Sequence, residues 1–328
     1  MRVLLTGGAG YVGSHSAAML DSIGHEIWVY DNLSEGHAAA VPDGRLVIGD
    51  LMDRPKLESV FREHRIEAVM HFAASCYVGL SVTDPALYYQ NNIVGTLSLL
   101  DAMRAADVGR IVFSSTCATY GIPEVVPITE QEKQAPISPY GFTKLAIEHA
   151  LADYSHAYGM GYAALRYFNA SGASGAGVRG EDHDPETHLI PLVLQVALGQ
   201  RDDIKIFGDD YPTPDGTCIR DYIHVDDLAT AHIAALERLE PRTELKLNLG
   251  TGQGASVKEV IEACRKMTGH PIPATTVPRR EGDPPELVAD ARLANTALNW
   301  QPKYSNIEPI VASAWKWHQG HPRGYEDR

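Results

Sequence analysis

Residues 3–22 read VLLTGGAGYVGSHSAAMLDS, and this stretch decides the fold. It opens with an apolar run, passes through a glycine-rich turn and ends in a segment of helix length. A strand, a glycine turn and a helix in this order are the context that a dinucleotide fingerprint requires. Gly7 and Gly10 would let the backbone approach a pyrophosphate, and Gly13 would let the helix pack closely on the strand. The start of the helix would offer N–H donors and a positive dipole.

An acidic residue follows the next apolar run. Asp31 ends a strand that we expect at residues 26–30, and it lies 18 positions beyond Gly13. A carboxylate at that place accepts hydrogen bonds from the adenosine ribose hydroxyls and repels a 2′-phosphate. We therefore expect NAD rather than NADP. A glycine-rich turn without a ligand is the alternative, and the strand, the helix and Asp31 together count against it.

Short apolar runs alternate with helix-length segments through the first half of the chain. Strands are expected at residues 3–6, 26–30, 45–48, 68–72, 110–114 and 162–167, and helices at residues 11–22, 85–105 and 140–158. This alternation predicts an α/β fold with a Rossmann-type, doubly wound parallel sheet. The predicted NAD-binding domain covers residues 1–168.

The amino-acid composition of the sequence changes after Asn169. A stretch rich in glycine, alanine and serine turns acidic within residues 170–186, and shorter elements with many prolines follow. We expect a smaller, mixed α/β C-terminal domain for the substrate at residues 169–328. A helical pattern at residues 224–239 and a strand-like run at 246–250 suit a return to the first sheet.

Two more strand ends are candidates for ligand contacts, because open α/β sheets bind ligands at the carboxyl ends of their strands. Asp50 and Leu51 follow the third expected strand, and residues 72–74 follow the fourth. For Asp50, the N-cap of a helix that begins before Pro55 stays open as an alternative role.

Charge and composition exclude several kinds of partner. The chain has 28 lysines and arginines against 42 aspartates and glutamates, a formal charge of −14. A field of that sign repels polyphosphate backbones and anionic lipid, so nucleic acid and membranes are poor partners. The sequence has no signal segment and no run of about 18 apolar residues, so we expect a cytoplasmic protein. Its four cysteines lack a C-x-x-C spacing, and we expect free thiols.

A tyrosine and a lysine form a candidate catalytic pair. Tyr140 and Lys144 stand four positions apart at the start of an expected helix, so their side chains share one face of it. An ammonium beside a phenol favours the phenolate and lowers the phenol pKa from about 10 toward the range of a general base. Surface helices produce such a pair by chance. A strand end rich in serine and threonine, at residues 114–116, makes the catalytic interpretation the stronger one.

Further motifs run along essentially the whole chain. They are TGGAGYVG at 6–13, DNL at 31–33, YYQNN at 88–92, GTL at 95–97, SPYG at 138–141 with Lys144, LRYFN at 165–169, DGT at 215–217, RDYIHV at 220–225, NLGTG at 248–252 and RREGD at 279–283. Through them the sequence resembles the extended short-chain dehydrogenase/reductase family, and within it the enzymes that invert C4 of UDP-hexoses. The resemblance implies tightly bound NAD, a transient 4-keto sugar and the interconversion of UDP-galactose and UDP-glucose without net redox.

The resemblance also implies roles for single residues. Tyr140 is the expected base at the sugar 4-hydroxyl, Lys144 holds the nicotinamide ribose and tunes Tyr140, and Thr116 bonds to the same hydroxyl. Cofactor contacts are expected at Gly7, Gly10, Tyr11, Val12, Gly13, Asp31, Asn32, Asp50, Leu51, Phe72, Ala73, Ala74, Asn91, Ser114, Tyr140, Lys144, Tyr167 and Phe168. Cys76 stands where relatives often carry a basic residue, which leaves one cofactor contact open.

An anionic nucleotide sugar needs cations in an acidic chain. The resemblance places Arg220 and Arg280 at the diphosphate, and a surface ion pair with Asp221 or Glu281 is the alternative for them. The remaining expected substrate contacts are Thr116 and Tyr140 at the sugar, Asn169 and His188 at the diphosphate, Lys205 and Phe207 at the uracil, Asp283 at the uridine ribose, and Leu189 and Leu287.

Several alternatives concern the reaction itself. Leu287 stands where some relatives carry a bulky tyrosine beside the sugar C2, so UDP-N-acetylhexosamine or UDP-pentose stays open as a substrate. Dehydratases of the family commonly have an acidic residue beside the serine or threonine, whereas Cys117 and Ala118 follow Thr116 here, which favours simple oxidation and re-reduction. A non-catalytic NAD-binding sensor is disfavoured because both the tyrosine and the lysine are present.

The chain has fourteen histidines, which raises the question of a metal. Residues 182–184 with His188 lack a paired spacing such as H-x-x-x-H on a helix, so we expect no metal site. Residues 181–186 are interpreted as a solvated acidic loop.

The helices expected at residues 85–105 and 140–158 form a dimer interface in the family, so the resemblance implies a homodimer.

Overall fold

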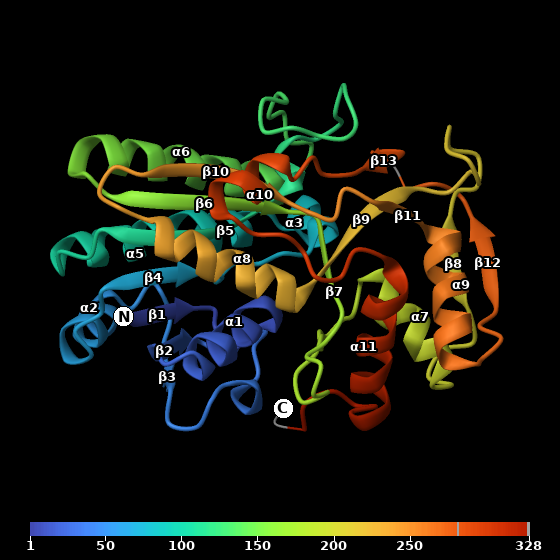
Figure 1. Ribbon diagram of the computed structural model, residues 1–328, viewed down its shortest axis with the longest axis horizontal. Helices are drawn as coiled ribbons and strands as arrows, with labels where there is room; N and C mark the ends of the chain where they lie inside the picture. Colours follow the sequence, from blue (N-terminus) through green and yellow to red (C-terminus); the bar gives the residue numbers. More distant parts are fainter. Residues whose placement is uncertain (281, 327–328) are drawn as a thin grey trace.

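A seven-stranded parallel sheet occupies one half of the computed structural model, which describes residues 1–280 and 282–326 (Figure 1). Its order is β10-β6-β5-β4-β1-β2-β3. These strands are β1 (Arg2–Thr6), β2 (Glu26–Asp31), β3 (Leu46–Ile48), β4 (Ala68–His71), β5 (Arg110–Thr116), β6 (Gly161–Tyr167) and β10 (Glu244–Leu249). The order reverses between β1 and β4, which confirms the expected doubly wound α/β fold. Glu281 of the RREGD motif and the last two residues of the expected substrate domain lie outside the described residues.

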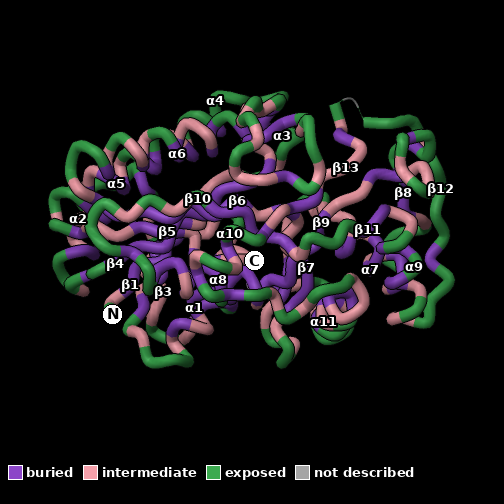
Figure 2. The backbone as a smooth tube through the Cα atoms, turned by 45° about the horizontal axis from the view of Figure 1, so that its top comes forward, coloured by how far each residue is buried: buried purple, intermediate pink, exposed green. Residues whose placement is uncertain are grey.

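Helices cover both faces of this sheet. The helices α1 (Tyr11–Ser22), α8 (Val225–Arg238) and α10 (Arg292–Leu298) pack on one face, and α2 (Arg54–Glu63), α5 (Gly95–Ala105) and α6 (Pro139–Tyr158) pack on the other. Successive residues of a strand point to opposite faces, so Leu5 belongs to the first core and Leu4 to the second. Burial on both faces explains why these strands are continuous apolar runs, and Figure 2 shows them buried at the centre of the molecule.

The segment expected as one helix at residues 85–105 has three parts. It contains α4 (Pro85–Tyr88), the π-helical segment η2 (Tyr89–Val94) and α5, and a short α3 (Val78–Thr83) precedes it. Asn92 is fully buried inside η2. Its side-chain amide donates to the Ser75 carbonyl and to Thr143 Oγ1, both at 3.1 Å. Because these bonds satisfy a buried amide, they favour the local widening of the helix at this point.

The C-terminal half contains two small sheets and three helices. The strands β7 (Asn169–Ser171), β9 (Ile219–His224), β11 (Gly254–Ser256) and β13 (Glu286–Leu287) form one sheet, and β8 (Ile204–Phe207) pairs with β12 (Ala274–Val277) in the other. The helices α7 (Leu189–Ala197), α9 (Val257–Thr268) and α11 (Ile307–Gly320) share a core with them. In Figure 1 the strands of the large sheet end at the side on which this half lies.

The chain passes between the two halves more than once. After β9, α8 packs beside α1, and β10 pairs with β6 from Glu244 to Leu249. Residues 225–249 therefore belong to the large sheet and its helices, whereas β9 itself lies in the small sheet. The division of the chain into domains at Phe168 stays a prediction. Within residues 1–280 and 282–326, no helix has the length and apolar character needed to cross a membrane.

Candidate active site

The glycine turn after β1 is held by close backbone contacts. Gly7 has a φ of +70°, and a Cβ there would lie 2.3 Å from the Ala73 nitrogen. A Cβ on Gly13 would lie 2.4 Å from the Gly7 oxygen, so α1 packs directly on the turn. A Cβ on Gly10 would meet only the Gly7 oxygen, at 3.4 Å, and Gly10 gives α1 no side-chain cap. The turn thus leaves an open approach to the first-turn N–H groups of α1, which fits a pyrophosphate.

Asp31 joins this turn to the end of β2. Its carboxylate accepts the Ala9 N–H and the Leu33 N–H, both at 2.9 Å, while burial raises its pKa. Asn32 donates to the Asp50 carboxylate at 2.9 Å. The helix N-cap of α2 is Asp53, so the alternative of an N-cap role for Asp50 is wrong. Two carboxylates beside the glycine turn fit the ribose and adenine end of a dinucleotide.

The other expected cofactor residues line the same edge of the sheet. The N–H groups of Phe72 and Ala73 both donate to the Thr6 carbonyl, which fixes the end of β4 against the turn. Leu51 is buried, Val12 and Ala74 are partly buried, and Asn91 donates to Ser75 Oγ at 3.0 Å. The Tyr11 hydroxyl donates to the Gly172 carbonyl at 2.6 Å, which ties the start of α1 to the C-terminal half.

The candidate catalytic residues meet at the carboxyl end of β5. Ser138 caps α6, so Tyr140 and Lys144 lie in its first two turns. Lys144 Nζ donates to the Ser114 carbonyl at 2.8 Å and lies 5.9 Å from the centre of the Tyr140 ring. Ser114 Oγ and the Tyr167 hydroxyl are 2.5 Å apart. The structure therefore brings together Ser114, Tyr140, Lys144 and Tyr167, as the sequence predicts.

The pKa values of Tyr140 and Lys144 differ from the expectation. Burial raises the pKa of Tyr140 well above 10, and the charges of Tyr167 and Cys76 add to the rise. A hydrogen bond with Thr116 has the opposite, smaller effect. Burial lowers the pKa of Lys144 to about 8. The expected lowering of the Tyr140 pKa is therefore not seen in the chain without ligands, because burial outweighs the effects that oppose it. The phenol keeps its proton in this form.

A buried hydrogen-bond network that the sequence did not predict supports the candidate catalytic residues. Glu148 lies one turn after Lys144 on α6 and accepts from Arg166 of β6 at 2.6 Å and from Ser115 of β5 at 2.6 Å. Arg166 also donates to the Tyr120 hydroxyl at 2.8 Å. The network clamps α6 to the two strands that carry the site. An arginine inside an apolar strand run was the available signal, because a buried guanidinium requires a carboxylate partner.

Arg220 and Asp283 lie together in the C-terminal half. Arg220 forms an ion pair with Asp283, and it also donates to the Ile219 carbonyl at 2.8 Å. The alternative partner Asp221 is excluded, because its carboxylate accepts the N–H groups of Thr251, Gly252 and Ala289 instead. The two residues that the sequence assigns to the diphosphate and the ribose thus form one pair.

The expected uracil residues lie on the exposed face of β8. Lys205 pairs with Asp203 at 2.7 Å, and the Arg280 guanidinium stacks 3.9 Å from the centre of the Phe207 ring. Asn169 begins β7, which pairs with β9.

Leu287 pairs in register with Arg220 and packs on the cluster that contains Cys117 and Phe168. Leu287 therefore lies between the catalytic strand end and the arginine.

The structure of the segment before α7 corrects the expectation of a solvated acidic loop. Glu181 is buried and the Glu186 side chain is 5% exposed, so residues 181–186 are not simply a solvated acidic loop. His188, the residue before α7, has its Nδ1 2.8 Å from Glu181 Oε1. Burial alone would lower the pKa of His188, but the charges of Glu181 and Glu186 raise it well above its usual value.

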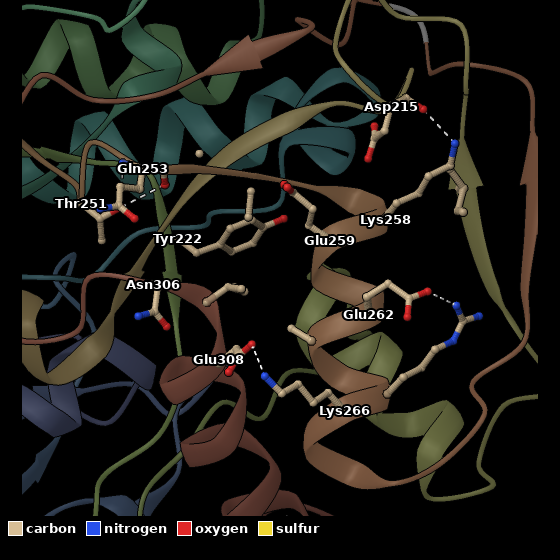
Figure 3. A pocket seen from close by; sticks show the side chains of 16 residues that line it. Asp215, Tyr222, Thr251, Gln253, Lys258, Glu259, Glu262, Lys266, Asn306 and Glu308 are labelled. Atoms are coloured by element: carbon tan, nitrogen blue, oxygen red, sulfur yellow. Dashed lines mark hydrogen bonds and ion pairs between the residues drawn. The ribbon is translucent and has the colours of Figure 1, made fainter.

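A groove of about 880 Å³ lies elsewhere, between α9 and α11 (Figure 3). Among the residues that the structure describes, none of the expected cofactor or substrate contacts lines it. Lys266 pairs with Glu308 in it, and Lys258 donates to the backbone carbonyl of Asp215. We assign the groove no ligand.

The parallel sheet, the open glycine turn and the Tyr140–Lys144 pair beside Ser114 define a NAD-binding enzyme of the short-chain dehydrogenase/reductase type. The model of the NAD dependent epimerase/dehydratase family matches residues 3–250, and the chain belongs to this family. The expected cofactor is confirmed as NAD. All four cysteines are free, as expected.

Known proteins resemble the chain over nearly its whole length. It is 54% identical to the UDP-glucose 4-epimerase of Halalkalibacterium halodurans over 99% of this chain and 98% of that protein. The crystal structure of UDP-glucose 4-epimerase from Brucella ovis in complex with NAD is 51% identical, with a TM-score of 0.92 and coverage of 96% and 97%. The Bifidobacterium longum enzyme in complex with NAD+ and UDP is 39% identical, with a TM-score of 0.94 and coverage of 99% and 100%.

Proposed function

We propose that the protein inverts C4 of a UDP-hexose, interconverting UDP-galactose and UDP-glucose through a transient 4-keto sugar. The observation that carries the proposal is the group of Thr116, Tyr140 and Lys144 at the end of β5. Leu287, which pairs in register with Arg220, packs on the cluster that contains Cys117, the residue after Thr116. A hydroxyl-bearing carbon placed at the end of β5 can lose and regain hydrogen.

The residues at the strand end suit proton transfer at one hydroxyl. Tyr140 exchanges a proton with the sugar 4-hydroxyl, and Thr116, which already bonds to the phenol, orients that hydroxyl. NAD, when bound, would supply a hydride acceptor and donor at C4, so the alcohol could be oxidised and the ketone reduced on its opposite face without net redox. Lys144 is placed to hold a ribose hydroxyl while it stays bonded to the Ser114 carbonyl.

The residues after Thr116 argue against elimination chemistry. A dehydratase needs a further acid or base beside the sugar. Burial raises the pKa of the Cys117 thiol to about 12, so it stays neutral, and Ala118 has no proton to transfer. Simple oxidation followed by reduction at C4 is the chemistry that these side chains support.

The C-terminal half supplies the binding groups for the nucleotide. Arg220 uses only part of its five N–H donors on Asp283 and the Ile219 carbonyl, so it can also bind a diphosphate. Asn169, His188 and Arg280 are proposed as further diphosphate contacts. Phe207 and Lys205 border the uracil, and Asp283 accepts from the uridine ribose.

Leu287 favours a second range of substrates. It packs beside Cys117 and Phe168, close to where the sugar ring lies in this proposal, and leucine is smaller than an aromatic side chain. UDP-N-acetylhexosamines or UDP-pentoses therefore fit as additional substrates. Comparing the turnover of UDP-galactose with that of UDP-N-acetylgalactosamine tests this, and a strong preference for the latter would overturn the main substrate assignment.

An apolar surface on one side of the large sheet supports a homodimer. Exposed residues of α3, α4, η2, α5 and α6 gather there: Val78, Leu80, Val82, Leu87, Tyr89, Val94, Leu97 and Phe142. Light scattering should give the mass of a dimer, and the double variant Leu97→Glu with Phe142→Glu should give a monomer. Ile23→Glu, at an exposed position after α1, is the matched control. A monomeric unmodified chain would contradict the dimer.

The experiment for the reaction needs no added cofactor. Denaturing the purified protein should release NAD, and the native protein should convert UDP-galactose to UDP-glucose on its own. Protein reconstituted with NAD that interconverts no UDP-hexose pair would refute the proposal. The cytoplasmic location stays a prediction.

A further inference from the structure

Residues 181–188, which read EDHDPETH, bring four possible metal ligands to one point. One donor atom each from Glu181, His183, Glu186 and His188 lies within 4.8 Å of all the others. His188 Nδ1 is 2.8 Å from Glu181 Oε1 and 3.3 Å from Glu186 Oε1. His183 Nδ1 is 3.5 Å from an oxygen of each of the same two carboxylates.

The two imidazole nitrogens point into this cluster without hydrogen-bond partners. Among the residues that the structure describes, neither His183 Nδ1 nor His188 Nδ1 makes a hydrogen bond, and both atoms are shielded from solvent. Each nitrogen lies at ion-pair distance from both carboxylates. The side chains of Glu181 and Glu186 are each 5% exposed. The two imidazole nitrogens thus converge with the two carboxylates, of which Glu186 also accepts the Thr187 and His188 N–H groups at 2.7 Å and 2.8 Å.

We propose that Glu181, His183, Glu186 and His188 bind one divalent transition-metal ion of the zinc class. In a tetrahedral zinc site the metal lies about 2.0–2.2 Å from each nitrogen or oxygen, which separates the ligand atoms by about 3.3–3.5 Å. The observed separations of 2.8–3.5 Å between imidazole and carboxylate atoms approach that geometry. The mixed nitrogen and oxygen donors favour zinc over magnesium or calcium, which prefer oxygen alone.

The site is structural rather than catalytic. Four protein ligands fill a tetrahedral zinc site and leave no open position for a substrate. Two carboxylates and two neutral imidazoles also balance the charge of a divalent ion. The rings of Tyr11 and Tyr77 pack edgewise on His183, with centres 6.3 Å and 6.0 Å away. The ion would therefore fix the chain before α7 against the start of α1.

The metal is compatible with the proposed role of His188 at the substrate. Coordination through Nδ1 leaves Nε2 as a fixed N–H donor, because the second ring nitrogen of a metal-bound imidazole keeps its proton. The His188 side chain is 43% exposed although its Nδ1 is shielded, so the rest of the ring faces outward. The metal site does not depend on the epimerase assignment, since its test measures metal rather than turnover.

The test is metal binding by the full-length protein. After dialysis against metal-free buffer, the protein should bind about one equivalent of Zn²⁺ per chain. With Co²⁺ in its place, it should show the intense visible absorption of a tetrahedral site. His183→Asn and Glu181→Gln should each weaken Zn²⁺ binding by at least about 100-fold. His270→Asn, at an exposed histidine of the same half, should leave binding unchanged.

A fold control separates loss of the site from loss of structure. Excess Zn²⁺ should raise the thermal midpoint of the unmodified chain and of His270→Asn, whereas His183→Asn should unfold cooperatively with no response to Zn²⁺. Three results would overturn the proposal: no stoichiometric metal on the unmodified chain, cobalt without the tetrahedral absorption, or equal binding by His183→Asn and the unmodified chain. The last of these would mean an adventitious ion only.

Discussion

The two halves of the molecule hold their functional side chains in different ways. In the nucleotide-binding half, Lys144, Ser114 and Tyr167 are joined by buried and partly buried hydrogen bonds at the ends of β5 and β6. In the C-terminal half, Arg220 and Lys205 are held by carboxylates in ion pairs that solvent reaches. A buried hydrogen bond fixes a group in place, whereas a phosphate can compete with a carboxylate for a guanidinium. The catalytic side chains are therefore fixed in place, whereas the substrate-binding cations can exchange a carboxylate partner for a phosphate.

The largest predicted effect comes from removing the one group that transfers the proton. Tyr140→Phe keeps the aromatic ring and removes only the hydroxyl, so turnover of UDP-galactose should fall by about 10³-fold or more. The NAD released on denaturation should stay at the level of the unmodified chain. Near-normal turnover in this variant would assign the proton transfer to another residue.

A pair of glycines tests how rigidly the nucleotide half is built. Gly7 and Gly269 have nearly the same φ, +70° and +73°, but only Gly7 has backbone atoms in the space of a Cβ. Gly7→Ala should lower the free energy of unfolding by about 3 kcal/mol, from strain and overpacking together. Gly269→Ala should cost about 1 kcal/mol, from the left-handed conformation alone. Equal losses, measured by denaturant unfolding, would contradict the close turn.

Two arginines of the C-terminal half test whether an ion-paired guanidinium binds the substrate. Arg220→Leu removes charge-assisted hydrogen bonds worth about 1.5–3 kcal/mol and should raise KM for UDP-galactose by about 10- to 100-fold, with kcat within about threefold. Arg279, paired with Asp210 at the surface, is the matched control, and Arg279→Leu should change KM by less than about twofold. A fall in kcat as large as the rise in KM would place Arg220 in the chemical step instead.

The smallest predicted effect is a pH dependence of stability in the nucleotide half. Burial lowers the pKa of His232 to about 4, although its bond to the Leu228 carbonyl opposes the shift. The unfolded chain binds a proton near pH 6.5, so the contribution of neutral His232 is complete above that pH and is lost as the pH falls toward 4.

Between pH 6 and 4.5, the unmodified chain should therefore lose about 1 kcal/mol per pH unit more than His232→Leu does. Denaturant unfolding across this range measures the difference. His156→Leu, at an exposed position of α6, should behave like the unmodified chain. Parallel pH curves for the unmodified chain and His232→Leu would mean that His232 has a normal pKa.

The comparison also explains what the sequence could predict. The glycine turn, the strand ends and the Tyr140–Lys144 pair follow from local patterns: a turn needs glycine where a Cβ would clash, and a helix puts residues four apart on one face. These features were placed within a few residues of their observed positions. The π-helical segment at Asn92 was missed, because it depends on bonds to Ser75 and Thr143, which are distant in the chain.

The misses lie where partners come from distant segments or where burial changes a charge. Glu148 and Arg166 find each other only once α6 packs on β6. Burial, which sequence does not give, keeps Tyr140 protonated in spite of Lys144. In residues 181–188 no paired ligand spacing marks the sequence, and only the folded loop shows that Glu181, His183, Glu186 and His188 converge.

The central claim is that the hydrogen at C4 leaves and returns within one buried site. The direct measurement is the reaction of UDP-galactose in D₂O with the purified protein and no added cofactor, followed by NMR of the UDP-glucose formed. A hydride that is removed and returned never exchanges with solvent, so the product should carry no deuterium at C4. One deuterium at C4 of the product would contradict the account, because the hydrogen would then have left as a proton.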